Sequence, residues 1–442
     1  MARIVMEAVT PVSVKSGKKS VMTDALVIRD VNGLPFIPGT SLAGVLRHIM
    51  GEDPKKEDSL FGYQDGEKGS GSRLIFSDAV MIGKEGKPMD GLCEINFQDE
   101  FYSHFRDLPI RQHVRIEEHG VGADHGKFDE EVVFRGTRFI FDVELLSAGT
   151  QEEEAYFKEV LHKLYGSSFR IGSGTRCGFG EMKIVSCRTA FLNLRDEADM
   201  EKYLNKSSDL TEEADCYDTE FEETHYTSEG WTAYTLSLHP EDFFLFGSGF
   251  GDDDADMTPL EEGFIKWKDG IPEFVPNIQT TVIPATSIKG AIAHRTAYHW
   301  NKLNHRFADN DDGLVGDENP AVATLFGTSE DGSDIKISRG NVMFTGLVKE
   351  YNERKLLNHV AIDRFTGGAI NGALFTEKTV DGSNMEDFTI EIYVADEALT
   401  DETIVKSFEL SLEDLSCGML PLGGGVNRGH GIFTGTWKKE KK

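Results

Sequence analysis

Two glycine-rich loops in this sequence have the composition of phosphate-binding loops. Both follow the pattern GxGxxxGxG, at residues 172–180 and again at residues 423–431. Glycines let a polyanion approach the backbone amides without meeting a Cβ atom, and Arg176 and Arg428 add positive charge inside the loops. The glycines expected to contact phosphate are Gly172, Gly174, Gly178, Gly423, Gly425 and Gly429.

Each loop also has a plainer interpretation, a tight turn that packs against a helix. For one loop alone the two interpretations are about equally good, and the duplication of the loop favours phosphate binding. Neither loop ends in Gly-Lys-Ser/Thr. Hydrolysis of a nucleotide at a P-loop is therefore not expected.

A second motif also occurs twice and predicts the elements that position the loops. Residues 37–48 read IPGTSLAGVLRH, and residues 283–294 read IPATSIKGAIAH. In each copy a proline ends an apolar run, a Thr-Ser pair offers hydroxyls to cap orphan amides, and an apolar-periodic helix follows. Gly44 and Gly290 cost helix propensity, which is understandable if another backbone or a ligand approaches the first turn closely.

The remaining elements recur in the same order, which indicates internal duplication. LFG occurs at residues 60–62 and 325–327, and HVRI at 113–116 is matched by HVAI at 359–362. The first half reads β, α, β, hairpin, β, α, glycine loop, β, including a strand over residues 73–82. That order is close to a ferredoxin-like βαββαβ unit with a large insertion.

We therefore predict an α+β protein made of two tandem ferredoxin-like or RRM-like domains. The expected boundaries are residues 1–188 for the first domain, 189–228 for an acidic linker without clear periodicity, and 229–442 for the second domain. Each domain carries a projecting hairpin. The hairpin of the first domain contains His113, His119 and His125, whose six-residue spacing suits neither a helix face nor a zinc knuckle, so no metal site is predicted there.

Composition limits the possible partners. The net charge of -30 counts against nucleic acid, but much of the acid lies in local runs while arginines recur inside the repeated motifs, so a basic groove on an acidic body is possible. Five scattered cysteines without a CxxC pair argue against a disulfide framework and a structural zinc site. No apolar run reaches about 18 residues, so no membrane partner is expected and the cytoplasm is the expected location.

The combination of IPGTSLxG, LFG, HVxIDRxTGGA and the C-terminal glycine loop resembles the RAMP superfamily of CRISPR effector subunits. In particular, it resembles the backbone subunit of type III complexes, and two copies in one chain are similar to the tandem fusion of type III-D systems. The resemblance covers nearly all of both halves except the linker and an acidic insertion at residues 243–280. It implies palms that stack along a guide RNA and thumb hairpins that wedge into the guide–target duplex, displacing one base pair at regular intervals.

The implied partners are the guide RNA, the target RNA and other subunits of the effector complex. The glycine loops, their arginines and the projecting hairpins agree with sequence-independent backbone contacts and with unstacking of bases. Besides the loop residues, the positions expected to contact RNA are Lys18, Lys19, Ser41, Arg47, Arg115, Ser287, Lys289, Arg364 and Phe365. Arg47 has the alternative of being an ordinary exposed helix residue. The first thumb departs from the pattern, with Glu117 and Glu118 where the second has Asp363 and Arg364.

In catalytically active relatives an aspartate before the IPGTS motif promotes metal-dependent cleavage of target RNA at the displaced position. Asp24 matches that position, and Asp254 or Asp256 is the candidate in the second domain. A carboxylate can hold Mg²⁺ or another divalent cation, or a water, near the scissile phosphate while the adjacent 2′-hydroxyl attacks in line.

Two alternatives to target cleavage stay open. One is a purely structural guide-binding subunit. The other is an endonuclease that processes precursor guide RNA through His119 or His125 without a divalent cation.

Overall fold

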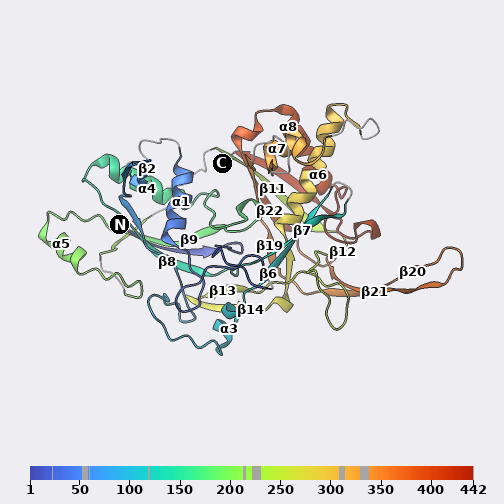
Figure 1. Ribbon diagram of the computed structural model, residues 1–442, viewed down its shortest axis with the longest axis horizontal. Coiled ribbons are helices and arrows are strands. Elements are labelled where there is room, and N and C mark those ends of the chain that lie inside the picture. The colour runs from blue at the N-terminus through green and yellow to red at the C-terminus, as the bar shows by residue number, and fades with distance from the viewer. Residues whose placement is uncertain are drawn as a thin grey trace.

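Two antiparallel sheets with the same strand order form the two halves of the chain (Figure 1). The computed structural model describes residues 1–21, 23–51, 58, 60–117, 120–212, 216–221, 230–307, 314–328 and 338–441. The first sheet has the order β10-β9-β1-β8-β4, with β5 also on β8, and the second has the order β18-β22-β11-β23. In both sheets the first strand, β1 or β11, lies at the centre. Its two neighbours are the strand that follows the glycine loop, β9 or β23, and the strand that follows the hairpin, β8 or β22. This order confirms the predicted tandem ferredoxin-like α+β fold.

The strands of the first sheet are β1 (Ala2–Ala8), β4 (Leu74–Phe76), β5 (Val80–Met81), β8 (Arg138–Leu145), β9 (Met182–Thr189) and β10 (Thr219–Glu220). Those of the second are β11 (Trp231–Pro240), β18 (Val342–Phe344), β22 (Phe388–Ala395) and β23 (Phe433–Lys441). Strand β1 shows why the pattern folds this way, because every second side chain, including Ile4 and Met6, is buried. On its other face Arg3 pairs with Asp142 of β8 at 2.8 Å.

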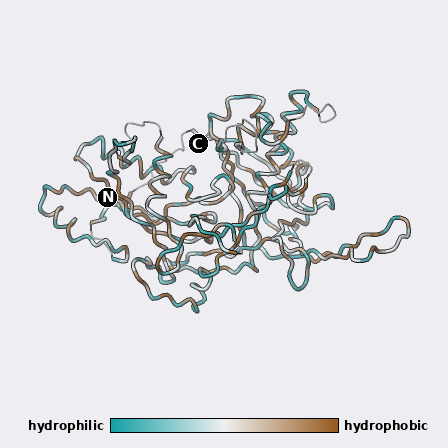
Figure 2. Tube along the Cα trace, in the orientation of Figure 1, coloured by the Kyte–Doolittle hydropathy of each residue, from teal (hydrophilic) through white to brown (hydrophobic). Residues whose placement is uncertain are grey.

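Helices pack on one face of each sheet (Figure 1). They are α1 (Gly39–Met50) and α4 (Gln151–Lys163) in the first half, and α6 (Ala285–Leu303), α7 (Pro320–Phe326) and α8 (Glu402–Ser416) in the second. Leu42 and Leu46 of α1 meet Ile4 and Phe157 in the first core, and Ile288 of α6 meets Phe408 in the second. Figure 2 shows the hydrophobic stretches of the chain running through these strands and helices.

The start of α1 differs from the sequence prediction. The Thr-Ser pair caps neither α1 nor α6, because the residue before each helix is the proline and the pair lies inside the first turn. In the first domain the amide of Gly39 donates instead to Oδ1 of Asp78 at 2.8 Å. Asp78 can reach that amide because the strand predicted over residues 73–82 is interrupted, forming β4 and β5 on either side of it.

The segment predicted as a linker packs partly on the first domain. Its described residues contain α5 (Glu197–Leu204) and β10, which pairs with β9 and forms the edge of the first sheet. Tyr217 is buried there, and its hydroxyl donates to Asp142 at 3.0 Å. Residues 213–215 and 222–229 lie outside the described part. The segment expected to be an acidic linker therefore contains a helix and a short strand in the part that the structure describes.

The insertion at residues 243–280 joins the two domains. Its strands are β12 (Phe243–Phe244), β13 (Phe264–Lys268) and β14 (Ile271–Val275), followed by β15 (Thr280–Ile283). Ile265 belongs to the core of the first domain, and Nε1 of Trp267 donates to the carbonyl of Gly136 at 2.7 Å. Phe274 stacks on His104 of α3 (Glu100–Arg106) with 3.5 Å between ring centroids. The insertion therefore fixes the second domain against the first.

Each domain carries the predicted hairpin, and the two hairpins share a detail of register. The first consists of β6 (Ile110–Ile116) and β7 (Gly122–Glu131), the second of β20 (Arg354–Ile362) and β21 (Ala369–Asp381). A bulge separates Val114 from Ile116 in the first and Val360 from Ile362 in the second. The second hairpin projects far from the body of the protein (Figure 1).

The shorter strands are β2 (Tyr63–Asp65), β3 (Lys68–Ser70), β16 (Gly327–Thr328), β17 (Ser338–Arg339) and β19 (Leu347–Glu350). Within the described residues, no helix has the length and apolar character needed to cross a membrane.

Candidate nucleic-acid interface

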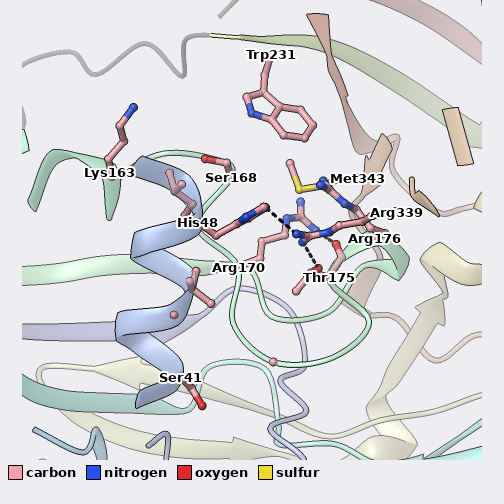
Figure 3. A pocket seen from close by; sticks show the side chains of 14 residues that line it. Ser41, His48, Lys163, Ser168, Arg170, Thr175, Arg176, Trp231, Arg339 and Met343 are labelled. Carbon is pink, nitrogen blue, oxygen red and sulfur yellow. Dashed lines mark hydrogen bonds between the residues drawn. The ribbon is translucent and has the colours of Figure 1, made fainter. Parts of the chain in front are cut away.

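A basic cavity of about 530 Å³ lies where the first domain meets the second (Figure 3). Helix α1 contributes Ser41, Gly44 and His48, and the first glycine loop contributes Gly172, Thr175 and Arg176. The second domain contributes Trp231, Arg339 and Met343, while Lys163 and Arg170 complete the basic lining. Among the described residues that line the cavity, none is Asp or Glu. On a chain with a net charge of -30, this concentration of positive charge indicates an anion site.

Arg176 is the most informative side chain of this basic cavity. Its Nε and Nη1 atoms are buried and have no hydrogen-bond partner among the described residues. Its guanidinium lies 5.2 Å from the centroid of the Trp231 ring. Burial, followed by repulsion from Arg339 and Arg170, lowers the pKa of Arg176 to about 10. Buried donors without acceptors are costly, so an anion that accepts from Arg176 would be stabilised.

The other two arginines tie the cavity to both domains. Arg170 is buried, donating from Nη1 to the carbonyl of Phe344 in the second domain at 2.9 Å and pairing through Nη2 with Glu181 at 3.0 Å. Figure 3 shows Arg339 reaching between His48 and Thr175. Its Nη1 lies 2.9 Å from Nε2 of His48 and its Nη2 lies 3.5 Å from Oγ1 of Thr175. Since arginine only donates, Nε2 of His48 is the acceptor there.

Gly44 and Gly290 face open space. A Cβ atom built on either glycine would meet no heavy atom of the described residues within 4 Å. The close approach of another backbone, one of the two reasons expected for these glycines, is therefore excluded. For Gly44, which lines the basic cavity, room for a ligand remains.

The two glycine loops have nearly the same backbone conformation. The φ angles are 90°, 67°, 90° and 77° at glycines 172, 174, 178 and 180, against 89°, 72°, 89° and 75° at 423, 425, 429 and 431. Each loop also contains one turn of 3₁₀ helix, Thr175–Cys177 and Val426–Arg428. These positive φ angles explain the glycines, because side chains with a Cβ rarely adopt them. The sequence match between the loops therefore reflects a shared structure.

Several loop amides are already used inside the chain. Ser173 donates to the carbonyl of Ser13 at 2.7 Å, and Cys177 donates to that of Gly174 at 2.7 Å. In the second loop, Gly424 donates to Leu245 at 2.7 Å. The expected cradle of successive free amides is thus only partly available. In the first loop the positive charge of Arg176 is the stronger attraction for a phosphate.

The loops differ in what lies beside their third glycine. A Cβ atom on Gly178 would lie 2.3 Å from the Cβ of Ala285 at the start of α6, whereas a Cβ atom on Gly429 would meet none of the described part of the chain within 4 Å. Lys289 of α6 also faces the first loop, with its Nζ 3.8 Å from Sγ of Cys177. Ser287 lies in the first turn of the same helix. The IPATS segment of the second domain therefore packs on the first glycine loop.

Two of the arginines expected to contact phosphate have partners inside their own domains. Arg47 donates to the carbonyl of Gly62 at 2.8 Å and to Asp58 at 2.7 Å, which links α1 to the LFG segment. Arg428 donates to the buried Glu377 at 2.5 Å. Each contact lies within one domain, and a phosphate contact of either arginine stays a prediction.

Asp24 lies on an exposed loop that also carries Lys18 and Lys19. Its amide donates to Oδ1 of Asp129 at 2.8 Å, and its Oδ2 accepts from the amide of Asp129 at 3.2 Å. Asp129 belongs to β7, so the loop is attached to the base of the first hairpin. Next to this pair, Ala25 bridges Glu130 in the parallel sense.

The same arrangement in the second domain identifies the counterpart of Asp24. Oδ2 of Asp256 accepts from the amide of Thr376 at 2.8 Å, and Met257 bridges Glu377 in the parallel sense. Asp254 instead lies 3.7 Å from Lys378. Asp256 therefore corresponds to Asp24, a choice that the sequence left open because the preceding loops differ in length.

The donor set at these aspartates suits a cation shared with a substrate. Within the described residues, no three His, Cys, Asp or Glu side chains gather in a way that could hold a metal ion. Asp24 and Asp256 are each exposed. Mg²⁺ is commonly held by one or two carboxylates together with substrate phosphates. The residues therefore fit a divalent cation that arrives with a phosphodiester, and they do not form a resident metal centre.

The hairpin ends expose side chains that can contact bases. Phe365 is 85% exposed at the end of the second hairpin, with the Arg364 guanidinium 5.1 Å from its ring centroid. Arg115 lies at the bulge of the first hairpin and is exposed. His125 is exposed with a φ of 56°, and His119 and Glu118 lie outside the described residues.

Several residues at these sites were not predicted from the sequence. They are His48, Lys163, Arg170, Trp231 and Arg339 in the basic cavity, and Glu130 and Glu377 at the hairpin bases. Arg339 and Trp231 reach the cavity only because the domains pack together. Arg170 lies two residues before the first glycine loop and His48 ends the repeated motif at residues 37–48, so these two positions carried a signal in the sequence.

Comparison with known families agrees with this arrangement. The model of the RAMP superfamily matches residues 5–183 and 268–434, one region in each half, and together these regions cover more than half of the chain. A comparison with curated proteins gave no match. With two matched regions on two ferredoxin-like domains, the chain belongs to the RAMP superfamily of CRISPR-associated RNA-binding proteins.

Proposed function

We propose that this chain is a tandem backbone subunit of a type III CRISPR ribonucleoprotein, similar to the fusions of type III-D systems. It holds the guide RNA at the junction of its domains and cleaves the target RNA beside Asp24 and Asp256. The observation that carries the proposal is the basic cavity, where buried nitrogens of Arg176 have no acceptor among the described residues.

The basic cavity suits the sugar-phosphate backbone of RNA. Arg176 and Arg339 provide charge-assisted donors for phosphate oxygens, which bind nucleic acid without reading its sequence. Ser41 and Thr175 add hydroxyls that can pair with a 2′-hydroxyl. Trp231 offers an aromatic surface beside the phosphate-binding groups. A guide of any sequence would meet the same contacts.

The two hairpins carry exposed apolar side chains that could separate the base pairs of a guide–target duplex. Val114 and Ile116 of the first hairpin match Val360 and Ile362 of the second, and all of these apolar side chains are exposed. Exposed apolar side chains on a projecting ribbon can insert between base steps and unstack them. In the second hairpin Phe365 adds an aromatic ring for stacking.

Cleavage would use one aspartate in each domain. The backbone amide of Asp129 or Thr376 binds one carboxylate oxygen and so sets the direction of the other. The attacking group is the 2′-hydroxyl of the RNA itself, and the aspartate orients it or accepts its proton. Asp24 and Asp256 would hold the divalent cation, which would supply charge neutralisation at the phosphate.

The test compares RNA binding by the wild-type full chain and by Arg176→Gln, with Lys266→Gln as control. Lys266 is a half-exposed surface lysine paired with Glu350. We expect Arg176→Gln to weaken binding of a single-stranded RNA about tenfold or more, the usual effect of losing one charge-assisted hydrogen bond. The slope of log Kd against log salt concentration should also decrease by about one, as expected for the loss of one phosphate contact. Equal affinities for Arg176→Gln and the wild type would contradict the proposal.

The alternatives make different predictions for the assembled complex. A purely structural subunit binds target RNA with Mg²⁺ present and produces no cut that maps to this chain. A processing endonuclease cleaves precursor guide RNA as an isolated protein without a divalent cation.

A further inference from the structure

Two buried glutamates occupy equivalent places at the bases of the hairpins. Glu130 in β7 is 4% exposed, and Glu377 in β21 is fully buried. Each directly follows the residue whose amide binds the exposed aspartate, Asp129 or Thr376. Carboxylates are rarely buried without charged partners, and both of these have them.

Glu130 joins the hairpin to the first glycine loop. Its Oε2 accepts from the hydroxyl of Ser173 in that loop at 3.1 Å and lies 3.1 Å from Nζ of Lys15. Its Oε1 lies 3.2 Å from Nε2 of His113 on the opposite hairpin strand. Burial raises the pKa of Glu130, but the neighbouring side chains of His113 and Lys15 outweigh it and bring the pKa to about 2. The carboxylate is therefore ionised.

Glu377 makes the same connection with different partners. Arg428 of the second glycine loop donates to its Oε2 at 2.5 Å. Its Oε1 lies 2.9 Å from Nε2 of His359, the counterpart of His113, and 3.5 Å from Nδ1 of His430. Both domains thus keep the glutamate and the hairpin histidine, while the group from the glycine loop changes from a hydroxyl to a guanidinium.

The same backbone positions hold the aspartate loops. Ala25 bridges Glu130, and the amide of Glu131 donates to the carbonyl of Ala25 at 2.9 Å. Met257 bridges Glu377, and the amide of Lys378 donates to the carbonyl of Met257 at 2.8 Å. In each domain one glutamate therefore connects the aspartate loop, the hairpin and the glycine loop.

We propose that Glu130 and Glu377 are positioning residues, each of which holds the target-cleaving aspartate of its domain in a fixed place relative to the glycine loop. The proposal rests on the proposed function. A pair of apolar side chains could hold the base of a hairpin at a lower free-energy cost than a buried ionised carboxylate. The ion pair therefore points to a role in fixing the positions of the segments that it joins. A shift of about 1 Å in a reacting group can reduce a rate about a hundredfold.

The test uses the assembled complex with guide RNA, saturating target RNA and Mg²⁺, and follows the two cuts separately. In Glu377→Gln we expect the cut beside Asp256 to slow about 10- to 100-fold, while the cut beside Asp24 keeps its rate. In Glu130→Gln we expect the cut beside Asp24 to slow by a similar factor, while the cut beside Asp256 keeps its rate. The amount of bound guide RNA and the KM for target RNA should be unchanged in both variants. Glu386→Gln, at an exposed carboxylate of the second domain, is the matched control.

The unaffected cut in each variant reports whether the chain is folded. Arg428→Gln disturbs the same ion pair from the glycine loop, so it should slow the same cut as Glu377→Gln. Two unchanged cuts in both glutamate variants, or an equal loss of both cuts together with guide RNA, would overturn the positioning role. A wild-type complex that makes no cut at either position would instead contradict the proposed function, and the positioning role with it.

Discussion

Arg111 and Glu262 form a buried ion pair across the domain junction, with 2.6 Å between Nε and Oε2. Their side chains are only 7% and 1% exposed. Arg111 lies in the first hairpin and Glu262 in the insertion of the second domain, so the pair fixes the base of one domain's hairpin to the other domain.

Removing one partner of this ion pair should destabilise the protein strongly. Glu262→Ala leaves the Arg111 charge buried without its partner, for which we expect a loss of about 3–5 kcal/mol in the free energy of unfolding. Glu350→Ala, which breaks the more exposed Lys266–Glu350 pair, should cost no more than about 1 kcal/mol. Urea denaturation of the full chain measures both. Similar losses for the two variants would show that the buried pair does not hold the junction.

Asp256 and Asp254 should differ in their effect on cleavage. Asp256→Ala removes the carboxylate that matches Asp24, so we expect the second of two target cuts to disappear while target binding persists. Asp254 is exposed and lies near Lys378, so Asp254→Ala should leave both cuts in place. Mapping the cleavage products of the assembled complex in Mg²⁺ distinguishes the two. A cut lost in Asp254→Ala alone would reverse the assignment.

Acid unfolding should show the ionised state of Glu130. Its pKa in the folded protein is about 2, below the ordinary value of 4.5, so the carboxylate stabilises the fold fully above pH 4.5. That contribution is lost as the pH falls from 4.5 toward 2. We therefore expect the stability difference between wild type and Glu130→Gln to be constant above that window and to shrink inside it. Chemical denaturation at several pH values measures this difference, and a difference independent of pH would contradict it.

Much of the fold could be predicted from the sequence because its signals are local. The alternation in β1, the apolar spacing in the helices and the repeated glycines each depend on neighbouring residues, and duplication made every signal appear twice. The positive φ angles of Gly172 and Gly423 follow directly from that repeat.

The remaining features depend on contacts between distant residues. Asp78 caps α1 across the domain, and Arg339 reaches His48 from the other domain. Glu130 and Glu377 each stand next to another charged residue, Glu131 or Lys378, so nothing in the sequence marks them as the buried ones. Local patterns carry no information about such contacts.

The contact between the domains can be tested at two matched glycines. Gly178 and Gly429 both have φ near 90°, so alanine at either position carries the same backbone strain, about 1–2 kcal/mol. At Gly178 the new methyl group would also lie 2.3 Å from Ala285, and at Gly429 it would enter open space. We expect Gly178→Ala to lower the midpoint of thermal unfolding further than Gly429→Ala. Because the displaced loop carries Arg176, Gly178→Ala should also weaken RNA binding, as followed by fluorescence anisotropy. Equal effects of the two substitutions on stability and on RNA affinity would mean that the first glycine loop does not depend on the second domain for its position.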